Sequence, residues 1–166
     1  MHKIIIINGN PRSGKDTFVN IAKDIFKDVY SISTVDNIKK YAKLLGWDGK
    51  KDNKGRQLLS DMKNSLTKYN IYYSIDIVKN MIANIPGDNA IVFVFAREPE
   101  EIKLFANELD AETVFIKRED SETYSNHGDA NVTNYLYDIY IENNGSLNNF
   151  RKKVVEYISN KILDKK

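Results

Sequence analysis

The chain has 166 residues, 42% of them hydrophobic, which suits one compact α/β domain of ordinary size. It contains no cysteine, which excludes disulfides, thiolate metal sites and cysteine nucleophiles, and we expect a cytoplasmic protein. The 25 Lys and Arg nearly balance the 23 Asp and Glu, so the net charge of +2 argues against a nucleic-acid partner. The apolar runs of the sequence, such as Ile4 to Ile7 and Ile91 to Ala96, are far shorter than the about 20 residues of a membrane helix, so no membrane association is expected.

The first predicted element is a strand over Lys3 to Ile7. A short β-branched run of this kind, ending at Asn8-Gly9, is typical of a strand that is buried on both faces. From Lys15 the pattern changes, because apolar residues recur at three- and four-residue spacing between Phe18 and Phe26. The chain therefore begins with a strand, a glycine-containing loop and a helix.

The middle of the chain is predicted to be mainly helical. A second short strand is expected at Val29 to Ser33, followed by a helix from Asp36 to Leu45. Two apolar stripes at helical spacing come next, one from Leu58 to Tyr69 and one from Ile71 to Ile85. We interpret both stripes as faces that pack in a core.

The second half returns to alternating strands and helices. Strands are expected at Ile91 to Ala96, Thr113 to Ile116 and Asp138 to Ile141. A helix from Pro99 to Leu109 separates the first two of these strands, and a helix from Leu147 to Ile162 closes the chain. Because strands that alternate with helices form parallel sheets covered on both faces, we predict a three-layer α/β/α fold with a mainly parallel five-stranded sheet.

One polar stretch interrupts this alternation. The segment from Lys117 to Asn134 contains a single aliphatic residue larger than alanine, Val132, among charged, Asn, Ser and Gly residues. It is longer than an ordinary connection between elements, so it is either a lid over a site, about 117–134, or a surface loop.

A phosphate-binding motif follows the first strand. The sequence Gly9-Asn10-Pro11-Arg12-Ser13-Gly14-Lys15 fits the first seven positions of the P-loop pattern and stands between a predicted strand and a predicted helix, as that motif requires. Its glycines let backbone N–H groups converge on phosphate oxygens, and its lysine reaches the β- and γ-phosphates. The alternative is a glycine-rich turn that only begins a helix. The predicted ATP-binding residues are Gly9, Asn10, Arg12, Ser13, Gly14, Lys15, Asp16 and Thr17.

The eighth position of the motif departs from the pattern. Asp16 stands where a Ser or Thr normally ligates Mg²⁺, and its carboxylate could bind the ion directly, bind it through water or orient an attacking oxygen. Thr17 supplies a hydroxyl that faces about 100° further round the helix and could contact a phosphate instead. Asp16 and Thr17 are therefore the candidate Mg²⁺ ligands, and Lys15 and Asp16 are candidate catalytic residues.

The stretch from Asn8 to Thr17, with Gly-Lys-Asp-Thr at its end, resembles the P-loop kinases of two groups. These are the phage-type deoxynucleoside monophosphate kinases and the animal-type phosphomevalonate kinases. Looser likenesses occur in the family's order at Asp36 to Lys40, Gly55 to Leu59, Arg97 to Glu101 and His127 to Asp129. The resemblance implies a single kinase domain over residues 1–166, with ATP and Mg²⁺, an acceptor-binding helical region at about 35–85 and a lid.

The resemblance also suggests which residues bind the acceptor. Arg56 stands where such kinases often hold the acceptor phosphate, which a guanidinium grips bidentately; the alternative is a solvated arginine at a helix end. Arg97 follows a strand whose carboxyl end is where ligands of open α/β sheets collect. Asp36 and Lys39 correspond to a segment near the acceptor, but Asp36 also suits a helix cap and Lys39 a solvated surface.

Two departures from the family concern catalysis. The strand that ends at Phe95 and Ala96 lacks the aspartate that usually stands at or near its tip, so Mg²⁺ would depend on nucleotide, water, Asp16 and Thr17. The predicted lid contains no arginine beyond Arg118 at its start. Arg118 is therefore the candidate for stabilising charge on the transferred phosphoryl group.

The predicted function is ATP-dependent phosphoryl transfer to a small phosphorylated acceptor, with a nucleoside or deoxynucleoside monophosphate as the leading candidate. A phosphomevalonate kinase-like enzyme is the second possibility. The third is a module that binds ATP or GTP without transferring phosphate, which the missing aspartate would permit. A GTPase is disfavoured because Asn53-Lys54-Gly55-Arg56 does not complete the guanine-binding pattern Asn-Lys-x-Asp.

Overall fold

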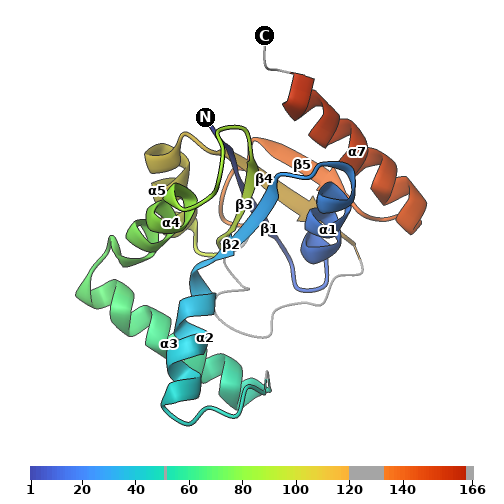
Figure 1. Cartoon of the computed structure of the whole chain (residues 1–166). Helices are drawn as coiled ribbons and strands as arrows, with labels where there is room; N and C mark the ends of the chain where they lie inside the picture. Colours follow the sequence, from blue (N-terminus) through green and yellow to red (C-terminus); the bar gives the residue numbers. More distant parts are fainter. Residues whose placement is uncertain (51, 120–132, 164–166) are drawn as a thin grey trace. The chain divides into compact units, whose positions relative to one another are not determined.

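The computed structural model describes residues 1–50, 52–119 and 133–163, and the chain divides into two compact units (Figure 1). One unit comprises Met1–Ile32 and Ile85–Lys166 and holds the sheet, whereas the other, Ser33–Asn84, is helical. Among the described residues, no helix is both long enough and apolar enough to cross a membrane.

The sheet has five strands in the order β2-β3-β1-β4-β5. Their bounds are Lys3–Gly9 for β1, Val29–Ser33 for β2, Ile91–Phe95 for β3, Glu112–Lys117 for β4 and Ile139–Glu142 for β5. The central strand β1 pairs in parallel with both β3 and β4, and β4 pairs in parallel with β5. Because the chain crosses from one side of β1 to the other after β3, the carboxyl end of β1 is the topological switch point of the sheet, where such folds bind ligands.

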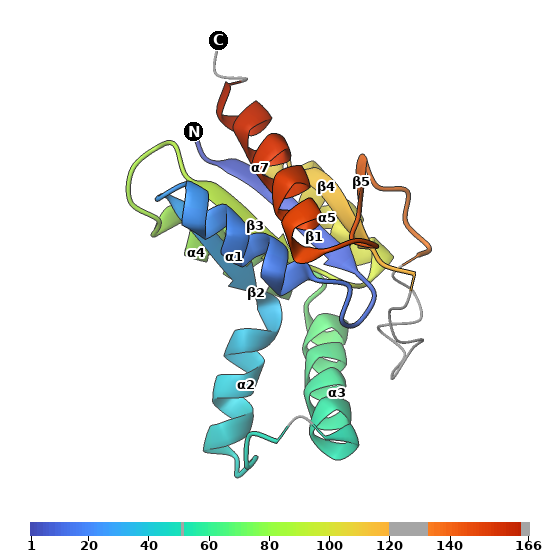
Figure 2. The ribbon, with the colours of Figure 1, turned by 90° about the vertical axis from the view of Figure 1, so that its right-hand side faces the viewer.

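Helices cover both faces of this sheet (Figure 2). Helices α1 (Lys15–Ile25) and α7 (Leu147–Leu163) pack against each other on one face, and α5 (Pro99–Leu109) contacts β1 and β4 from the other. The predicted three-layer α/β/α arrangement with a mainly parallel five-stranded sheet is therefore confirmed.

The main core lies between the sheet and the helices α1 and α7. Phe18 is fully buried there, and its ring lies 5.7 Å from those of Phe93 and Tyr157 and 6.1 Å from that of Phe150. Burying one such side chain stabilises a fold by about 1.5 to 3 kcal/mol. This packing fixes the start of α1, and with it the loop that precedes the helix.

The helical unit contains α2 (Thr34–Leu44), α3 (Asn53–Tyr69) and α4 (Tyr73–Ala83). Asp52 caps α3, since its carboxylate accepts the N–H of Gly55 at 2.8 Å. The small core of this unit gathers around three buried residues, with four partly buried ones against them: Ile38, Ala42 and Leu59, then Val35, Trp47, Met62 and Leu66.

The expectation that both apolar stripes are wholly core faces was wrong. Leu59 is buried, but Leu58 is 41% exposed and Tyr69 is 91% exposed. Adjacent residues of a helix point about 100° apart, so Leu58 and Leu59 do not share a face. In the stripe predicted from Ile71 to Ile85, Ile75 is buried in α4, whereas Ile71 precedes that helix and is exposed.

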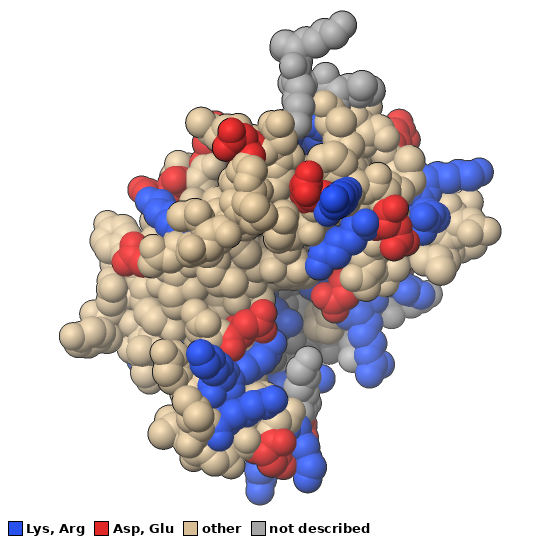
Figure 3. Space-filling view, in the orientation of Figure 1, with Lys and Arg blue, Asp and Glu red and all other residues tan. Residues whose placement is uncertain are grey.

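The remaining differences from the sequence prediction concern element ends. Helix α2 begins at Thr34 rather than at Asp36, and β1 extends to Gly9. Residues 120–132 of the predicted lid, including His127 to Asp129, lie outside the described residues. On the face shown in Figure 3, basic and acidic side chains are interspersed over the unit that holds the sheet.

Candidate active site

The loop between β1 and α1 has a backbone that only glycine fits at its two ends. Gly9 has φ +153°, and a Cβ atom there would lie 2.4 Å from the backbone oxygen of Ile116 on the neighbouring strand β4. Gly14 has φ +103°, and a Cβ atom there would lie 2.4 Å from Nδ2 of Asn143. Arg12 also has a left-handed backbone, with φ 60°, which is strained for a residue with a side chain.

The loop forms a cradle for an anion. The Nζ atom of Lys15 donates hydrogen bonds to the backbone oxygens of Gly9 at 2.6 Å and Asn10 at 2.8 Å, so this ammonium group lies over the loop. The hydroxyl of Ser13 is buried and has no hydrogen-bond partner in the described part of the chain. A phosphate oxygen held in the loop would satisfy that hydroxyl, so the residues present fit a nucleotide phosphate.

The N-terminus of α1 adds to this anion site. Gly14 is its N-cap and provides no side-chain cap, and the first amides of any α-helix have no acceptor within the helix. These amides and the helix dipole both favour negative charge at this end. Asp16, in the first turn, is exposed, and Thr17 beside it is half-buried.

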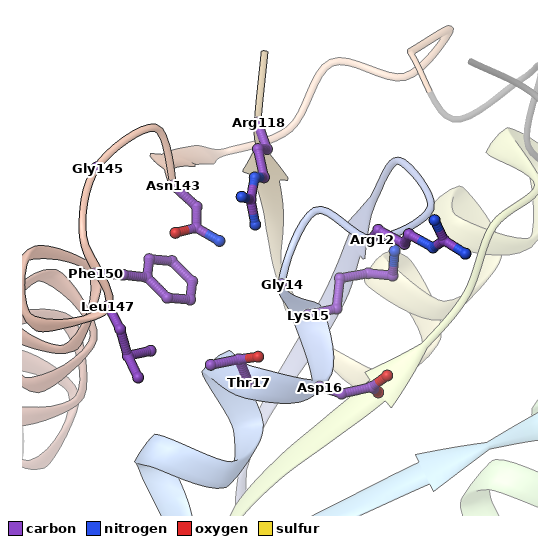
Figure 4. Close-up of a pocket in the computed structure, with 10 residues that line it drawn as sticks. All are labelled: Arg12, Gly14, Lys15, Asp16, Thr17, Arg118, Asn143, Gly145, Leu147 and Phe150. Atoms are coloured by element: carbon purple, nitrogen blue, oxygen red, sulfur yellow. The ribbon is translucent and has the colours of Figure 1, made fainter. Parts of the chain in front are cut away.

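A pocket of about 400 Å³ opens on the loop (Figure 4). The loop and α1 contribute Arg12, Gly14, Lys15, Asp16 and Thr17; the end of β4 contributes Arg118; and the connection from β5 into α7 contributes Asn143, Gly145, Leu147 and Phe150. Three of these side chains are basic and only one is acidic, so the lining favours an anionic ligand. In Figure 4 the side chain of Arg12 extends away from Asn143 and Phe150, whereas Arg118 points toward them.

Asn143 joins the far side of the pocket to the loop. Its Nδ2 atom donates to the backbone oxygen of Ser13 at 2.8 Å, and its backbone N–H donates to the backbone oxygen of Lys117 at 2.8 Å. Sequence analysis did not identify this residue, since one Asn in an Asn-rich chain has no distinguishing pattern. It also missed Gly145 as a lining residue, and assigned Leu147 and Phe150 only to a helix stripe.

The predicted site residues fall into three groups. The P-loop residues and Arg118 are brought together at the pocket. Arg97 is exposed just after β3 and is not among the lining residues. Asp36, Lys39 and Arg56 belong to the helical unit, where Arg56 is exposed in the first turn of α3.

The structure decides one alternative for Asp36. Ser33 is the N-cap of α2, so the interpretation of Asp36 as the cap was wrong. Asp36 instead forms an ion pair with Lys39, at 2.6 Å, on the surface of the same helix.

The side chains available for Mg²⁺ are few. Among the described residues, no group of three or more His, Cys, Asp or Glu is placed to hold a metal ion. The oxygens of Asp16 and Thr17 at the pocket are of the chemical type that Mg²⁺ prefers, and the ion usually completes its shell with substrate phosphates and water. The described site therefore fits an ion that arrives with a nucleotide.

Comparison with known proteins identifies the fold. No protein-family model matches the sequence, and no curated protein matches it. Among solved structures, TT1252 from Thermus thermophilus matches with a TM-score of 0.56 and 16% identity, over 96% of this chain and 98% of that chain. Dephospho-CoA kinase from Campylobacter jejuni matches with a TM-score of 0.53 and 18% identity, over 96% of this chain and 97% of that chain. The chain therefore shares the fold of that kinase.

Proposed function

We propose that this protein is an ATP-dependent phosphotransferase that acts on a small phosphorylated acceptor, with nucleoside and deoxynucleoside monophosphates as the first candidates. The observation that carries the proposal is the loop at the carboxyl end of the central strand. There a buried Ser13 hydroxyl lacks a partner among the described residues, and the Lys15 ammonium lies over the loop. The shared fold of a dephospho-CoA kinase supports the same function.

Each side chain of the pocket has a role in this proposal. The backbone amides from Arg12 to Asp16 hold the phosphates, and Lys15 neutralises charge on them. Arg118, which points into the pocket, stabilises the charge that develops on the transferred group. Because phosphoryl transfer needs little covalent participation by the protein, positioning and charge neutralisation are sufficient for catalysis.

We assign Asp16 and Thr17 as the protein ligands of Mg²⁺. When bound, the ion neutralises phosphate charge and orients the oxygens of the nucleotide. We assign acceptor binding to Arg56 and Arg97. We also assign Asp36 and Lys39 to the acceptor site, because their segment resembles the one near the acceptor in the kinases named above. Four further points remain predictions. The helical region and the sheet form one kinase domain, and segment 117–134 is its lid. The protein acts in the cytoplasm and has no nucleic-acid partner.

One observation favours a second function. Strand β3 ends at Phe95, followed by the buried Ala96, so the strand next to β1 presents no carboxylate at its tip. A protein that has this loop but transfers phosphate slowly would act as a module that binds ATP or GTP. A phosphomevalonate kinase-like activity rests on the sequence resemblance alone, and the experiment below includes that acceptor.

The first test measures Mg²⁺-dependent ADP release from ATP by the purified protein with a panel of acceptors. The panel contains nucleoside and deoxynucleoside monophosphates and phosphomevalonate. We expect one of these acceptors to stimulate ADP release well above the rate of ATP hydrolysis without acceptor. ATP binding without stimulation by any acceptor would instead favour the nucleotide-binding module.

Lys15→Ala tests the loop directly. We expect kcat/KM to fall by about 100-fold or more, the loss typical of removing one group that stabilises transition-state charge. Lys23→Ala is the matched control, because Lys23 lies in the last turn of the same helix and its ammonium donates to the hydroxyl of Ser31, at 3.2 Å, on the exposed surface. Full turnover by Lys15→Ala would show that the loop is not the phosphate site.

A further inference from the structure

The last residue before the loop is a buried asparagine. Asn8 ends the apolar run of β1 and is 0% exposed. Because side chains alternate along a strand, Asn8 shares a face with Ile6, opposite the face on which Ile5 and Ile7 join the main core. Burying an amide is unfavourable unless its hydrogen bonds are formed, so an apolar residue would pack here at lower cost.

The amide of Asn8 connects three separate segments. Its Oδ1 atom accepts the N–H of Gly9, the first loop residue, at 2.8 Å. Its Nδ2 atom donates to the hydroxyl of Tyr137 at 2.8 Å and lies 3.5 Å from the backbone oxygen of Arg97. The side chain therefore contacts the loop, the segment after β3 and the segment before β5.

Tyr137 is held firmly in its position. It is 4% exposed, and its ring lies 4.9 Å from that of Phe115 and within 6 Å of those of Tyr135 and Tyr140. Burial raises the pKa of the Tyr137 phenol above its ordinary value. An aromatic cluster thus presents a fixed hydroxyl to Asn8.

We propose that Asn8 and Tyr137 are positioning residues for the phosphate loop. Tyr137 fixes the amide of Asn8, the amide fixes the N–H of Gly9, and the carbonyl of Gly9 accepts the Lys15 ammonium at 2.6 Å. The hydrogen bonds therefore run from the aromatic cluster to the lysine of the loop. This inference rests on the proposed function, because it assigns the loop to nucleotide phosphates.

The test compares two variants that each lose one buried phenol hydroxyl. Tyr137→Phe keeps the ring and removes the partner of Asn8. Tyr157→Phe removes a hydroxyl that donates to Glu112, at the start of β4, whereas the loop residue Gly9 pairs with Ile116 near the end of that strand. Affinity for ADP is measured by calorimetry, and stability by denaturant unfolding. We expect Tyr137→Phe to raise the Kd for ADP about three- to tenfold, the range of one hydrogen bond, and Tyr157→Phe to leave Kd unchanged while lowering stability.

Amide hydrogen exchange provides a second measurement, which does not depend on the nucleotide. In Tyr137→Phe we expect faster exchange in a peptide that covers residues 8–15, and unchanged exchange in one that covers α7. Exchange that rises equally in both peptides would mean that Tyr137 contributes only to general stability, and would overturn the proposal.

The two hypotheses fail in different ways. If the wild-type protein binds ADP and Tyr137→Phe binds it equally well, the positioning role is overturned and the proposed function stands. If the wild-type protein binds neither ADP nor ATP, the proposed function is overturned and the positioning role with it.

Discussion

Asn143 and Gly14 are matched to each other, although they are far apart in the sequence. The Asn143 side chain occupies the space that a Cβ atom at Gly14 would need, and from there it donates to the oxygen of Ser13. The absence of a side chain at Gly14 thus allows the connection between β5 and α7 to approach the loop. The glycine serves packing as well as backbone conformation.

Gly14→Ala should therefore cost more than the backbone strain of alanine at φ +103°. Gly46 provides a matched control, because its φ is also +103° and a Cβ atom there would meet nothing within 4 Å. We expect Gly46→Ala to lower the free energy of unfolding by about 1 to 2 kcal/mol, and Gly14→Ala to lower it further.

Adding Asn143→Ala to Gly14→Ala separates the two contributions. We expect this second change to recover the stability lost to the clash but not the affinity for ADP, because the hydrogen bond to Ser13 stays absent. Equal losses in Gly14→Ala and Gly46→Ala, measured by denaturant unfolding, would mean that the close contact with Asn143 has no energetic consequence.

At the residue scale the sequence predicts what is local. The two glycines and Lys15 form a motif of seven consecutive residues, and the structure places them in one loop. The partners of that loop, Asn143 and Tyr137, lie about 130 residues away and have no fixed spacing from it. Such contacts depend on the completed sheet, which is why the sequence did not indicate them.

At the scale of elements, a polar cluster joins the start of β4 to α7. The hydroxyl of Tyr157 donates to Glu112, and Lys161 forms an ion pair with the same carboxylate at 2.6 Å. The ammonium of Lys161 also lies 5.3 Å from the centre of the Tyr157 ring. Burial first, and then the neighbouring Glu112, raise the pKa of the Tyr157 phenol well above its ordinary value.

This raised pKa makes stability fall at alkaline pH. Above pH about 10 the unfolded chain releases the proton of Tyr157 while the folded protein keeps it, so the unfolding free energy decreases as pH rises. Below pH about 10 both states are protonated and the contribution is fully present. We expect Tyr157→Phe to reduce this slope by about 1.4 kcal/mol per pH unit.

The measurement is urea unfolding at several pH values between 8 and 11, with Tyr69→Phe as the control. Tyr69 is exposed, and we expect its replacement to leave the slope unchanged. An identical slope in the wild-type protein and in Tyr157→Phe would contradict the prediction.

The elements themselves were predictable because their patterns are regular. Runs of β-branched residues mark β1 and β3, and Pro99 marks the start of α5. The ends were less predictable, as α3 begins at Asn53, well before its apolar stripe, because Asp52 provides a cap. Which apolar residues of α3 are buried depends on the neighbouring helix, and the sequence pattern alone did not distinguish Leu58 from Leu59.

At the scale of the whole molecule, the site is built on the strand order. Residues of the pocket follow β1, β4 and β5, so a ligand there contacts segments from both ends of the chain. A ligand that binds only the folded protein stabilises it by mass action. The sheet unit should therefore melt at a higher temperature when nucleotide is present.

We expect ATP at 100 times its Kd to add about 2.7 kcal/mol to the stability of the folded state. For a protein of this size that corresponds to a rise in melting temperature of about 5 to 11 °C. Differential scanning fluorimetry measures the shift, and Gly14→Ala should reduce it. No shift at a concentration known to saturate the protein would mean that ATP also binds the unfolded chain.

The central place of β1 has a consequence for synthesis on the ribosome. The strand and its loop are made well before their partners, since Lys3 pairs with Ile91, and the loop is completed only by Asn143. At about 5 to 20 residues per second, the loop waits on the order of ten seconds for that last contact. During this interval the nascent chain carries an unpaired, isoleucine-rich strand, and it therefore presents a binding segment for chaperones before it can bind a nucleotide.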